Sequence, residues 1–252
     1  MVENLSLRGR RAVVTGAARG LGRAIAARLA EAGTEIIAVD LPDIANDLPA
    51  GFQTEAIDLA DDQALDQLAE LADRLETVDI LIANAGLVPP WRGIDQLDLE
   101  EWDRVMRVNV FGVAATIGAF AGALERSGRG AVVAMASING YKAHPKQVLY
   151  TASKHAVIGV VRAAALDLGA RNIRVNALAP GPIATEALIG RVQNRHEAGG
   201  PPPDEAFSGL AAETALGRLA TETDVANAAV FLACEASGGM TGVVLPVEAG
   251  LA

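Results

Sequence analysis

Three side chains able to do acid–base chemistry stand close together in this sequence. Tyr150 and Lys154 are four positions apart in a segment typical of a helix, so they would share one helix face. The ordinary pKa of tyrosine is about 10, and a nearby cation favours the phenolate that a general base requires. Ser137 ends an apolar stretch upstream, where its hydroxyl could bind a substrate oxygen. This set suits proton transfer to or from an alcohol or ketone oxygen while the carbon that carries it loses or gains a hydride.

Each of these residues also has a plainer interpretation. A Tyr–Lys pair at this spacing is more often a surface pair, and Ser137 alone would be a turn serine at a strand end. Asn109 lies in an apolar segment, where an amide can kink a helix or satisfy neighbouring polar groups. The chain has only two tyrosines, Tyr141 and Tyr150, so the pair is not one match among many.

A glycine-rich loop near the amino terminus is typical of a dinucleotide site. The apolar run Ala12–Val14 leads into Thr15–Gly22, and a helical pattern follows. Glycines permit a tight turn and a close approach to a pyrophosphate, which the helix N-terminus would bind. Asp40 ends the next apolar run, where it could bind the adenine ribose hydroxyls and repel a 2′-phosphate, or simply cap the strand end. Arg19 could pair with a 2′-phosphate, but no second cation follows Asp40, so NAD is the expected cofactor.

The elements that must position these residues alternate along the chain. Short apolar, β-branched runs predict buried strands, and the amphipathic stretches between them predict helices. The predicted strands are Ala12–Val14, Ile36–Val39, Ile80–Ala83, Ala131–Met135 and Val175–Leu178, with weaker candidates at Thr54–Ile57 and Val243–Val247. The predicted helices are Leu21–Ala32, Asp61–Leu75, Leu99–Leu124, Thr151–Leu168 and Asp224–Ala233.

This alternation predicts an α/β fold, a Rossmann-type doubly wound parallel sheet of about seven strands with helices on both faces. No linker divides residues 1–252, so we expect a single dinucleotide-binding catalytic domain. The segment Thr185–Leu216 differs in character, because Gly199, Gly200 and the three prolines after them break any long helix. We expect a substrate flap at about 183–216.

Taken together, the motifs resemble those of the classical short-chain dehydrogenase/reductase family, over nearly the whole chain. The segments similar to T-G-x-x-x-G-x-G, N-A-G, Y-x-x-x-K and P-G-x-I-x-T are Thr15–Gly22, Asn84–Gly86, Tyr150–Lys154 and Pro180–Thr185. Two departures occur: Ala83 replaces the first residue of N-N-A-G, and Val247–Gly250 reads V-E-A-G in place of V-D-G-G. The first departure affects a supporting hydrogen bond, and the second puts the expected C-terminal subunit contacts in doubt. Neither departure removes a catalytic group.

The resemblance implies a role for each matching residue. The implied catalytic residues are Asn109, Ser137, Tyr150 and Lys154. Tyr150 would be the acid/base, Lys154 would tune it and bind the nicotinamide ribose, and Asn109 would hold a water of a proton relay. The implied substrate contacts are Ser137, Asn139 and Tyr150. The implied cofactor contacts are Gly16, Arg19, Gly20, Leu21, Gly22, Asp40, Asp58, Leu59, Asn84, Ala85, Gly86, Tyr150, Lys154, Pro180, Gly181, Ile183 and Thr185.

The expected function is that of an NAD-dependent oxidoreductase, which transfers a hydride between a nicotinamide and a secondary alcohol or ketone. An NADP-dependent reductase of 3-oxoacyl groups or other carbonyls is the alternative within the family. A dinucleotide-binding protein without turnover, or a scaffold, would have no use for the acid–base pair.

Three segments should form the pocket: Leu87–Trp91, Ile138–His144 and the flap from Ile183 onward. Arg191 and Arg195 share a helix face in the flap and could clamp a carboxylate, although a solvated face is the commoner reason for such a pair.

Composition excludes other classes of function. The net charge of −10 argues against binding to nucleic acid, whose phosphates require a basic face. The only cysteine, Cys234, lies in an apolar run and is expected to be an inert buried thiol. The three histidines, His144, His155 and His196, are scattered, so no metal is expected.

Location and assembly are also expectations from the sequence. Met1–Arg11 lacks the apolar segment of a signal peptide, and Val108–Leu124 is short and rich in Gly and Ala for a membrane span. A cytoplasmic protein without a membrane partner is therefore expected. The helices Leu99–Leu124 and Thr151–Leu168 carry more apolar, small-residue surface than one sheet can cover. A dimer at least, and more specifically a homotetramer, would bury this surplus.

Overall fold

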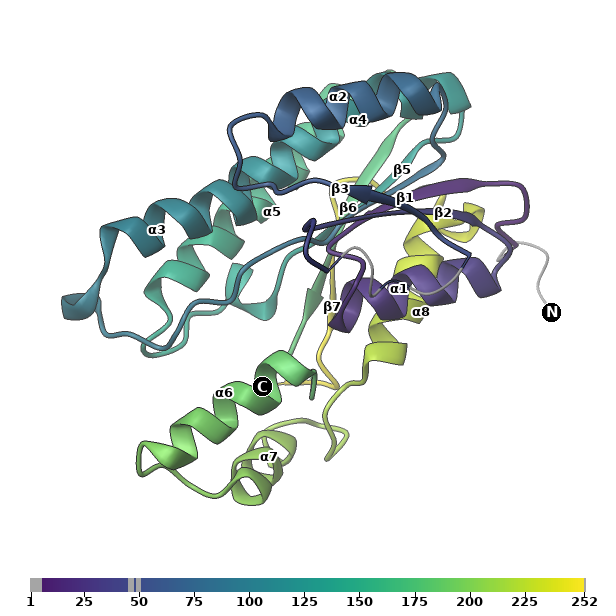
Figure 1. Ribbon diagram of the computed structural model, residues 1–252. Coiled ribbons are helices and arrows are strands. Elements are labelled where there is room, and N and C mark those ends of the chain that lie inside the picture. The colour runs from purple at the N-terminus through teal and green to yellow at the C-terminus, as the bar shows by residue number, and fades with distance from the viewer. Residues whose placement is uncertain (1–5, 45–47, 49–50, 252) are drawn as a thin grey trace.

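Parallel strands form the centre of the molecule. The computed structural model describes residues 6–44, 48 and 51–251, and in this part of the chain seven strands form one sheet in the order β3-β2-β1-β4-β5-β6-β7 (Figure 1). The strands are β1 (Arg11–Thr15), β2 (Glu35–Asp40), β3 (Gln53–Ala56), β4 (Ile80–Ala83), β5 (Ala131–Met135), β6 (Arg174–Pro180) and β7 (Val244–Val247). The two weaker strand candidates of the sequence are the edge strands, β3 and β7. Burial on both faces explains the unbroken apolar runs of β4 and β5.

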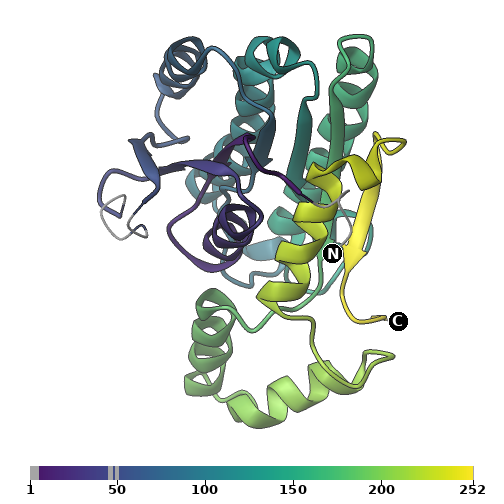
Figure 2. The same ribbon diagram turned by 90° about the vertical axis from the view of Figure 1, so that its right-hand side faces the viewer.

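Helices cover both faces of this sheet (Figures 1 and 2). On one face, α1 (Gly20–Glu31) and α8 (Glu222–Ala233) pack into one hydrophobic core. On the other face, α2 (Ala64–Leu75), α4 (Gly112–Ser127) and α5 (Val148–Gly169) pack into a second core. The predicted fold class, a doubly wound α/β sheet, is confirmed.

The strand order places the site. It reverses between β1 and β4, which are neighbours in the sheet although β2 and β3 separate them along the chain. In such sheets a ligand binds outside the carboxyl ends of the strands at this switch point. The glycine-rich loop follows β1, and the Asn84–Gly86 turn follows β4. Both predicted cofactor segments therefore lie at the expected edge.

The helix predicted over Leu99–Leu124 is interrupted. It consists of α3 (Leu99–Met106), a π-helical turn η4 (Arg107–Phe111) and α4. Asn109 lies inside the π turn, a geometry often found at functional sites. The whole run, Leu99–Ser127, is long and apolar enough to cross a membrane by length and composition, but 61% of its most apolar window is buried inside the protein. A core helix meets the same criterion.

Two helices of the flap stand apart from the sheet layers (Figure 2). They are α6 (Glu186–Glu197) and α7 (Pro203–Ala212), which lie between β6 and α8 in the chain. Thr185 caps α6, because its hydroxyl accepts the N–H of Leu188 at 3.3 Å. Gly199, at φ +90°, follows α6, and a proline begins α7.

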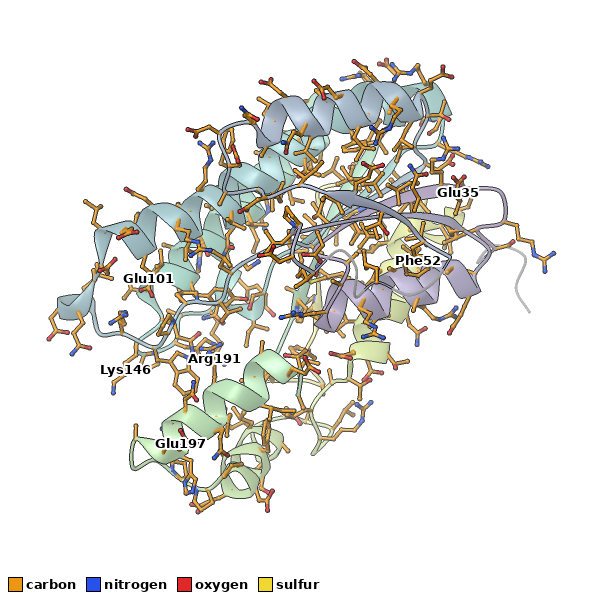
Figure 3. The ribbon with its side chains drawn as sticks, in the orientation of Figure 1. Glu35, Phe52, Glu101, Lys146, Arg191 and Glu197 are labelled. Carbon is orange, nitrogen blue, oxygen red and sulfur yellow. The ribbon has the colours of Figure 1, made fainter. Side chains whose placement is uncertain are left out.

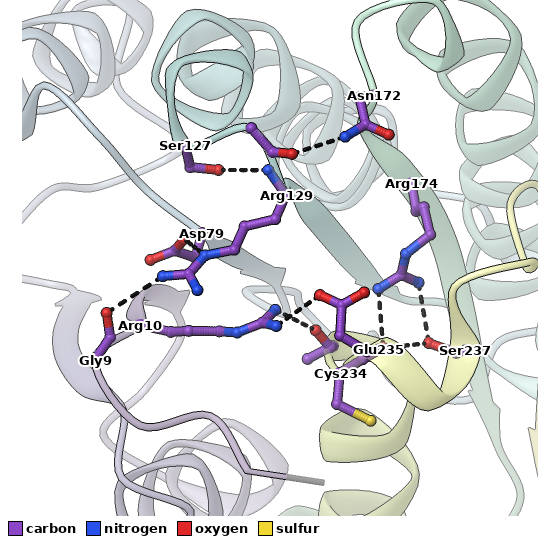
Figure 4. Close-up of polar contacts among 12 residues, drawn as sticks. Gly9, Arg10, Asp79, Ser127, Arg129, Asn172, Arg174, Cys234, Glu235 and Ser237 are labelled. Atoms are coloured by element: carbon purple, nitrogen blue, oxygen red, sulfur yellow. Dashed lines mark hydrogen bonds and ion pairs between the residues drawn. The ribbon is translucent and has the colours of Figure 1, made fainter. Parts of the chain in front are cut away.

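The opposite edge of the sheet is held together by arginines (Figure 4). Arg129 pairs with Asp79 at 2.6 Å, and Arg10 pairs with Glu235 at 2.7 Å. Arg174 donates to the Cys234 carbonyl at 3.2 Å. The Cys234 side chain is buried, as predicted. Arg129 joins the segments before β4 and β5, while Arg10 and Arg174 join the segment before β1 and the start of β6 to the end of α8. This edge of the sheet is therefore structural.

Candidate active site

Ser137 and Tyr150 meet at the carboxyl edge of the sheet, beside Lys154. α5 begins at Val148, three residues before the predicted start, so both Tyr150 and Lys154 lie in its first two turns. The Lys154 Nζ lies 5.7 Å from the centre of the Tyr150 ring and donates to the Met135 carbonyl at 2.8 Å. Ser137, just after β5, lies close enough to Tyr150 for its hydroxyl to lower the Tyr150 pKa. The three acid–base groups of the sequence analysis are thus brought together.

The electrostatics of this cluster are dominated by burial. Burial raises the pKa of Tyr150, while the hydrogen bond with Ser137 and the charge of Arg191 act in the opposite direction. Burial also lowers the pKa of Lys154 to about 8. The sequence predicts that Lys154 lowers the Tyr150 pKa, whereas in this structure burial outweighs every lowering influence. The Lys154 ammonium lies over the Tyr150 ring and donates to the Met135 carbonyl, and it is not among the groups that lower the Tyr150 pKa here.

Asn139 supports the cluster from within. Its Nδ2 donates to Gln147 Oε1 at 3.0 Å and to Thr151 Oγ1 at 3.3 Å. Its main-chain N–H donates to the Ser137 hydroxyl at 3.2 Å. The side chain is 5% exposed, so Asn139 joins Ser137 to the start of α5. The sequence predicts Asn139 as a substrate contact; these hydrogen bonds give it a positioning role.

Asn109 is fully buried, and its amide is engaged by protein groups. Oδ1 accepts the Leu87 N–H at 2.6 Å, and Nδ2 donates to the Leu87 carbonyl at 2.8 Å and to Ser153 Oγ at 3.3 Å. These contacts match the alternative of a satisfied core amide. A water relay at Asn109 would have to use the remaining lone pair of Oδ1 or the main-chain carbonyl.

Two of the loop glycines are required by internal packing. A Cβ on Gly22 would lie 1.9 Å from the Gly16 carbonyl oxygen and 2.5 Å from Asn84 Nδ2. Gly16 has φ +65°, and a Cβ there would lie 2.9 Å from the Ala85 Cα. Asn84 Nδ2 donates to the carbonyls of Thr15 and Gly16, at 3.0 Å each. The Asn84–Gly86 turn therefore holds the glycine loop in place.

Thr15 is a functional residue that the sequence analysis missed. Its hydroxyl accepts the N–H groups of Asn84 and Ala85, both at 3.1 Å. It therefore joins the glycine loop to the turn after β4. The sequence analysis placed Thr15 at the end of the first apolar run and at the start of the T-G-x-x-x-G-x-G match, but gave its side chain no role.

The residues around the glycine loop fit a dinucleotide. Arg19, the exposed N-cap of α1, provides no side-chain cap, and the first turn of α1 contains no acid, so the first N–H groups can bind a pyrophosphate. Gly20 has φ +49°, and a Cβ there would have no neighbour nearer than Thr185 Cγ2 at 3.9 Å. The loop therefore faces the beginning of the flap, and Leu21 lies in the first turn of α1, which begins at Gly20.

Asp40 has the strand-end capping role that the sequence left open, and its free lone pairs are compatible with the other role. Oδ2 accepts the Ala18 N–H at 2.7 Å and Oδ1 accepts the Leu41 N–H at 2.8 Å, so it caps the end of β2 and the glycine loop. Each oxygen keeps a second lone pair that can accept from a ribose hydroxyl. After β3, Asp58 accepts the Ala60 N–H, and Leu59 is buried beside Gly112.

The segment after β6 leads from the sheet into the flap. Pro180 ends β6, and Gly181 donates to the Val247 carbonyl at 3.0 Å. A Cβ on Gly181 would lie 2.6 Å from the Glu248 Cβ, so a side chain is excluded there. Ile183 is 5% exposed and packs in the core, which makes it a support and a poor pocket wall. Thr185 caps α6, as described above.

Two arginines of the flap stack on Trp91 of the loop after β4. The guanidinium carbons of Arg191 and Arg195 lie 4.7 and 5.3 Å from the centre of the Trp91 ring. Arg191 is half-buried and Arg195 is exposed, so the solvated-face alternative holds only for Arg195. The sequence could not place this stack, because it depends on how the flap lies against the loop. Among the described residues, no group of three His, Cys, Asp or Glu side chains could hold a metal ion.

Comparisons with known proteins agree with this geometry. A family model described as enoyl-(acyl carrier protein) reductase matches residues 16–252. The cis-4-hydroxycyclohexanecarboxylate dehydrogenase of Sinomonas cyclohexanicum is 33% identical over 250 residues, which cover 95% of each chain.

Two solved structures are similar over almost their whole length. Carveol dehydrogenase from Mycobacterium avium, in complex with NAD, has a TM-score of 0.85 and 32% identity, and covers 97% of this chain and 98% of its own. A protein from Beutenbergia cavernae with bound NADP at low occupancy has a TM-score of 0.85 and 34% identity, and covers 98% of both chains. A nicotinamide cofactor therefore suits this site, and the chain belongs to the short-chain dehydrogenase/reductase family.

Proposed function

We propose that this protein is an NAD-dependent dehydrogenase of secondary alcohols, with the reduction of the ketone as the reverse reaction, and that Tyr150 is its acid/base. The observation that carries the proposal is the Ser137–Tyr150–Lys154 cluster beside the glycine loop, at the edge where the strand order reverses. A nicotinamide supplies the hydride acceptor at this edge. The similarity to alcohol dehydrogenases supports the same reaction class.

Each residue of the cluster has a distinct task in this proposal. Tyr150 takes the proton of the substrate hydroxyl, and Ser137 donates a hydrogen bond to the substrate oxygen and so holds it next to Tyr150. Lys154 supplies the positive charge that favours the Tyr150 phenolate and hydrogen-bonds to the ribose of the cofactor. Because burial raises the pKa of Tyr150, proton uptake needs these opposing groups, and the Arg191 charge is a further one.

NAD is the proposed cofactor because of Asp40. Its buried carboxylate lies at the end of β2 and would repel a 2′-phosphate. The alternative is an NADP-dependent carbonyl reductase, which the exposed Arg19 in the glycine loop would favour. The similar structures include one with NAD and one with NADP, so the choice depends on this chain's own residues.

A substrate panel followed by the absorbance of reduced nicotinamide tests this function. The panel contains carveol, cis-4-hydroxycyclohexanecarboxylate and simple secondary alcohols, each with NAD and with NADP. We expect turnover, with kcat/KM for NAD at least about tenfold above that for NADP, which is the effect of about 1.4 kcal/mol of repulsion. A preference for NADP would favour the carbonyl reductase. Tight cofactor binding without turnover on any alcohol or ketone would indicate a binding protein instead.

A further inference from the structure

Arg191 is a cation near the active site for which the described residues provide no anionic partner. It extends from α6 on the side that faces the body of the domain (Figure 3), and its guanidinium lies 4.7 Å from the centre of the Trp91 ring. It forms no hydrogen bond or ion pair with any residue in the described ranges. Removing part of a guanidinium from water without a counter-charge is unfavourable, and a bound anion would supply that charge to the half-buried Arg191.

Arg191 is also close to the reacting groups. Its positive charge is near enough to lower the pKa of the Tyr150 hydroxyl, although burial raises that pKa more. The loop that carries Trp91 contributes Pro89 and Pro90 to a small cavity that Tyr150 also lines. A substrate whose carbinol oxygen lies at Tyr150 can therefore place another of its groups at Arg191.

The shape of the group favours a carboxylate. A guanidinium binds a planar carboxylate through two parallel hydrogen bonds. The Trp91 ring stacks on the Arg191 guanidinium and so fixes the plane of its N–H donors. The Trp91 Nε1 atom is buried and has no hydrogen-bond partner among the described residues. Its N–H is therefore a second unsatisfied donor beside the Arg191 guanidinium. A single half-buried cation matches one negative charge.

We propose that Arg191 binds a carboxylate of the substrate, so that the protein acts on hydroxy acids and the corresponding keto acids in preference to neutral alcohols. The inference rests on the proposed dehydrogenase function and specifies its substrate class. Arg191 is then the specificity-determining residue, and Trp91 is the platform that holds its guanidinium flat.

Arg195 provides a matched control for this role. It stacks on the same ring at 5.3 Å but is exposed, and its charge is not among those that act on Tyr150. Arg191→Met and Arg195→Met remove the same charge from the same helix face, one turn apart. If Arg191 merely held the flap on Trp91, the two variants would behave alike.

The experiment compares a charged and an uncharged form of one compound. The substrates are cis-4-hydroxycyclohexanecarboxylate and its methyl ester. The wild-type protein should prefer the acid. Arg191→Met should lower kcat/KM for the acid about 30-fold more than for the ester, because its effect on the Tyr150 pKa is common to both substrates and the charge-assisted contact is made only with the acid. Arg195→Met should change both by less than about threefold, and Arg191→Lys should recover part of the loss.

A second measurement does not depend on turnover of the acid. Cyclohexanecarboxylate and cyclohexanecarboxamide are compared as competitive inhibitors against whichever neutral alcohol of the panel is turned over. The wild-type protein and Arg195→Met should bind the carboxylate at least about tenfold more tightly than the amide, and Arg191→Met should bind both equally.

Equal losses on acid and ester, or no preference for the carboxylate inhibitor in the wild type, would overturn the role of Arg191. In that case turnover of neutral alcohols that needs Tyr150 would leave the dehydrogenase function standing. Absence of turnover on every alcohol would refute both the dehydrogenase function and the role of Arg191 in it. The thermal midpoints of the two Met variants should agree, which excludes a folding defect as the cause.

Discussion

Lys154 offers a quantitative test of the electrostatics of the site. The side chain is 4% exposed, and burial lowers its pKa from 10.5 to about 8. This lowering means that the folded protein makes the charged form of Lys154 about 3 kcal/mol less favourable relative to the neutral form. Between about pH 8 and pH 10.5 the unfolded chain binds the proton and the folded protein does not. The free energy of unfolding should therefore rise with pH through this window.

The perturbation is Lys154→Met, which keeps the length of the side chain and removes the titrating group. The destabilisation by Lys154 is fully present below pH 8 and is lost as the pH rises to 10.5. Between pH 7 and pH 9.5 the wild type should therefore gain about 2 kcal/mol relative to the variant. Contributions that do not titrate, including the loss of the hydrogen bond to Met135, cancel in this comparison.

The assay is urea-induced unfolding of the two cofactor-free proteins at both pH values. Lys146→Met, at an exposed lysine, is the control and should show no such change relative to the wild type. A difference between wild type and Lys154→Met that stays constant within about 0.5 kcal/mol would refute the reasoning, since a surface-like Lys154 has no burial penalty to lose. A change of opposite sign would refute it as well.

Three further predictions concern the cofactor loop and the assembly. Asp40→Ser should raise the ratio of NADP to NAD use, measured as kcat/KM, at least about tenfold; an unchanged ratio would remove Asp40 from cofactor selection. Gly22→Ala should lower the free energy of unfolding by about 1–3 kcal/mol or more, because its Cβ would lie 1.9 Å from the Gly16 oxygen. Gly209→Ala in α7, where nothing lies within 4 Å, should be tolerated in the same urea titration; equal losses would contradict the packing argument. We also propose a homotetramer, and at least a dimer, because Phe111 and Leu166 on the η4–α4 and α5 faces are 43% and 85% exposed. Sedimentation at micromolar concentration should show it, whereas a stable, active species near 25.9 kDa would contradict it.

The sequence was most informative where local pattern and local chemistry coincide. The first apolar run predicts β1, and the glycines after it predict the tight loop. The helical pattern that follows predicts α1, whose N-cap residue forms no side-chain hydrogen bond. Small differences have local causes. For example, α2 begins at Ala64 and not at Asp61, because the Asp61 carboxylate accepts the Gln63 N–H in a turn.

Features that depend on long-range contacts could not be predicted. Asn109 lies in a π turn, and its side-chain amide hydrogen-bonds to the main chain of Leu87. Leu87 is in the loop after β4, and the fold brings this loop next to Asn109. Arg191 and Arg195 look alike in sequence, and only the docking of α6 on Trp91 distinguishes the half-buried cation from the exposed one. Hydrophobic period and motif spacing contain no information on either contact.

The most direct test of the proposed mechanism is Tyr150→Phe, which deletes the titrating hydroxyl and little else. The variant should bind NAD about as tightly as the wild type, measured by titration calorimetry, because the Lys154 contact with Met135 does not involve the hydroxyl. Its turnover of the best alcohol in the panel should fall about a hundredfold or more, the usual contribution of a general base. Normal NAD binding with lost turnover is the predicted result. Retention of more than a few per cent of the wild-type activity would show that Tyr150 is not the acid/base.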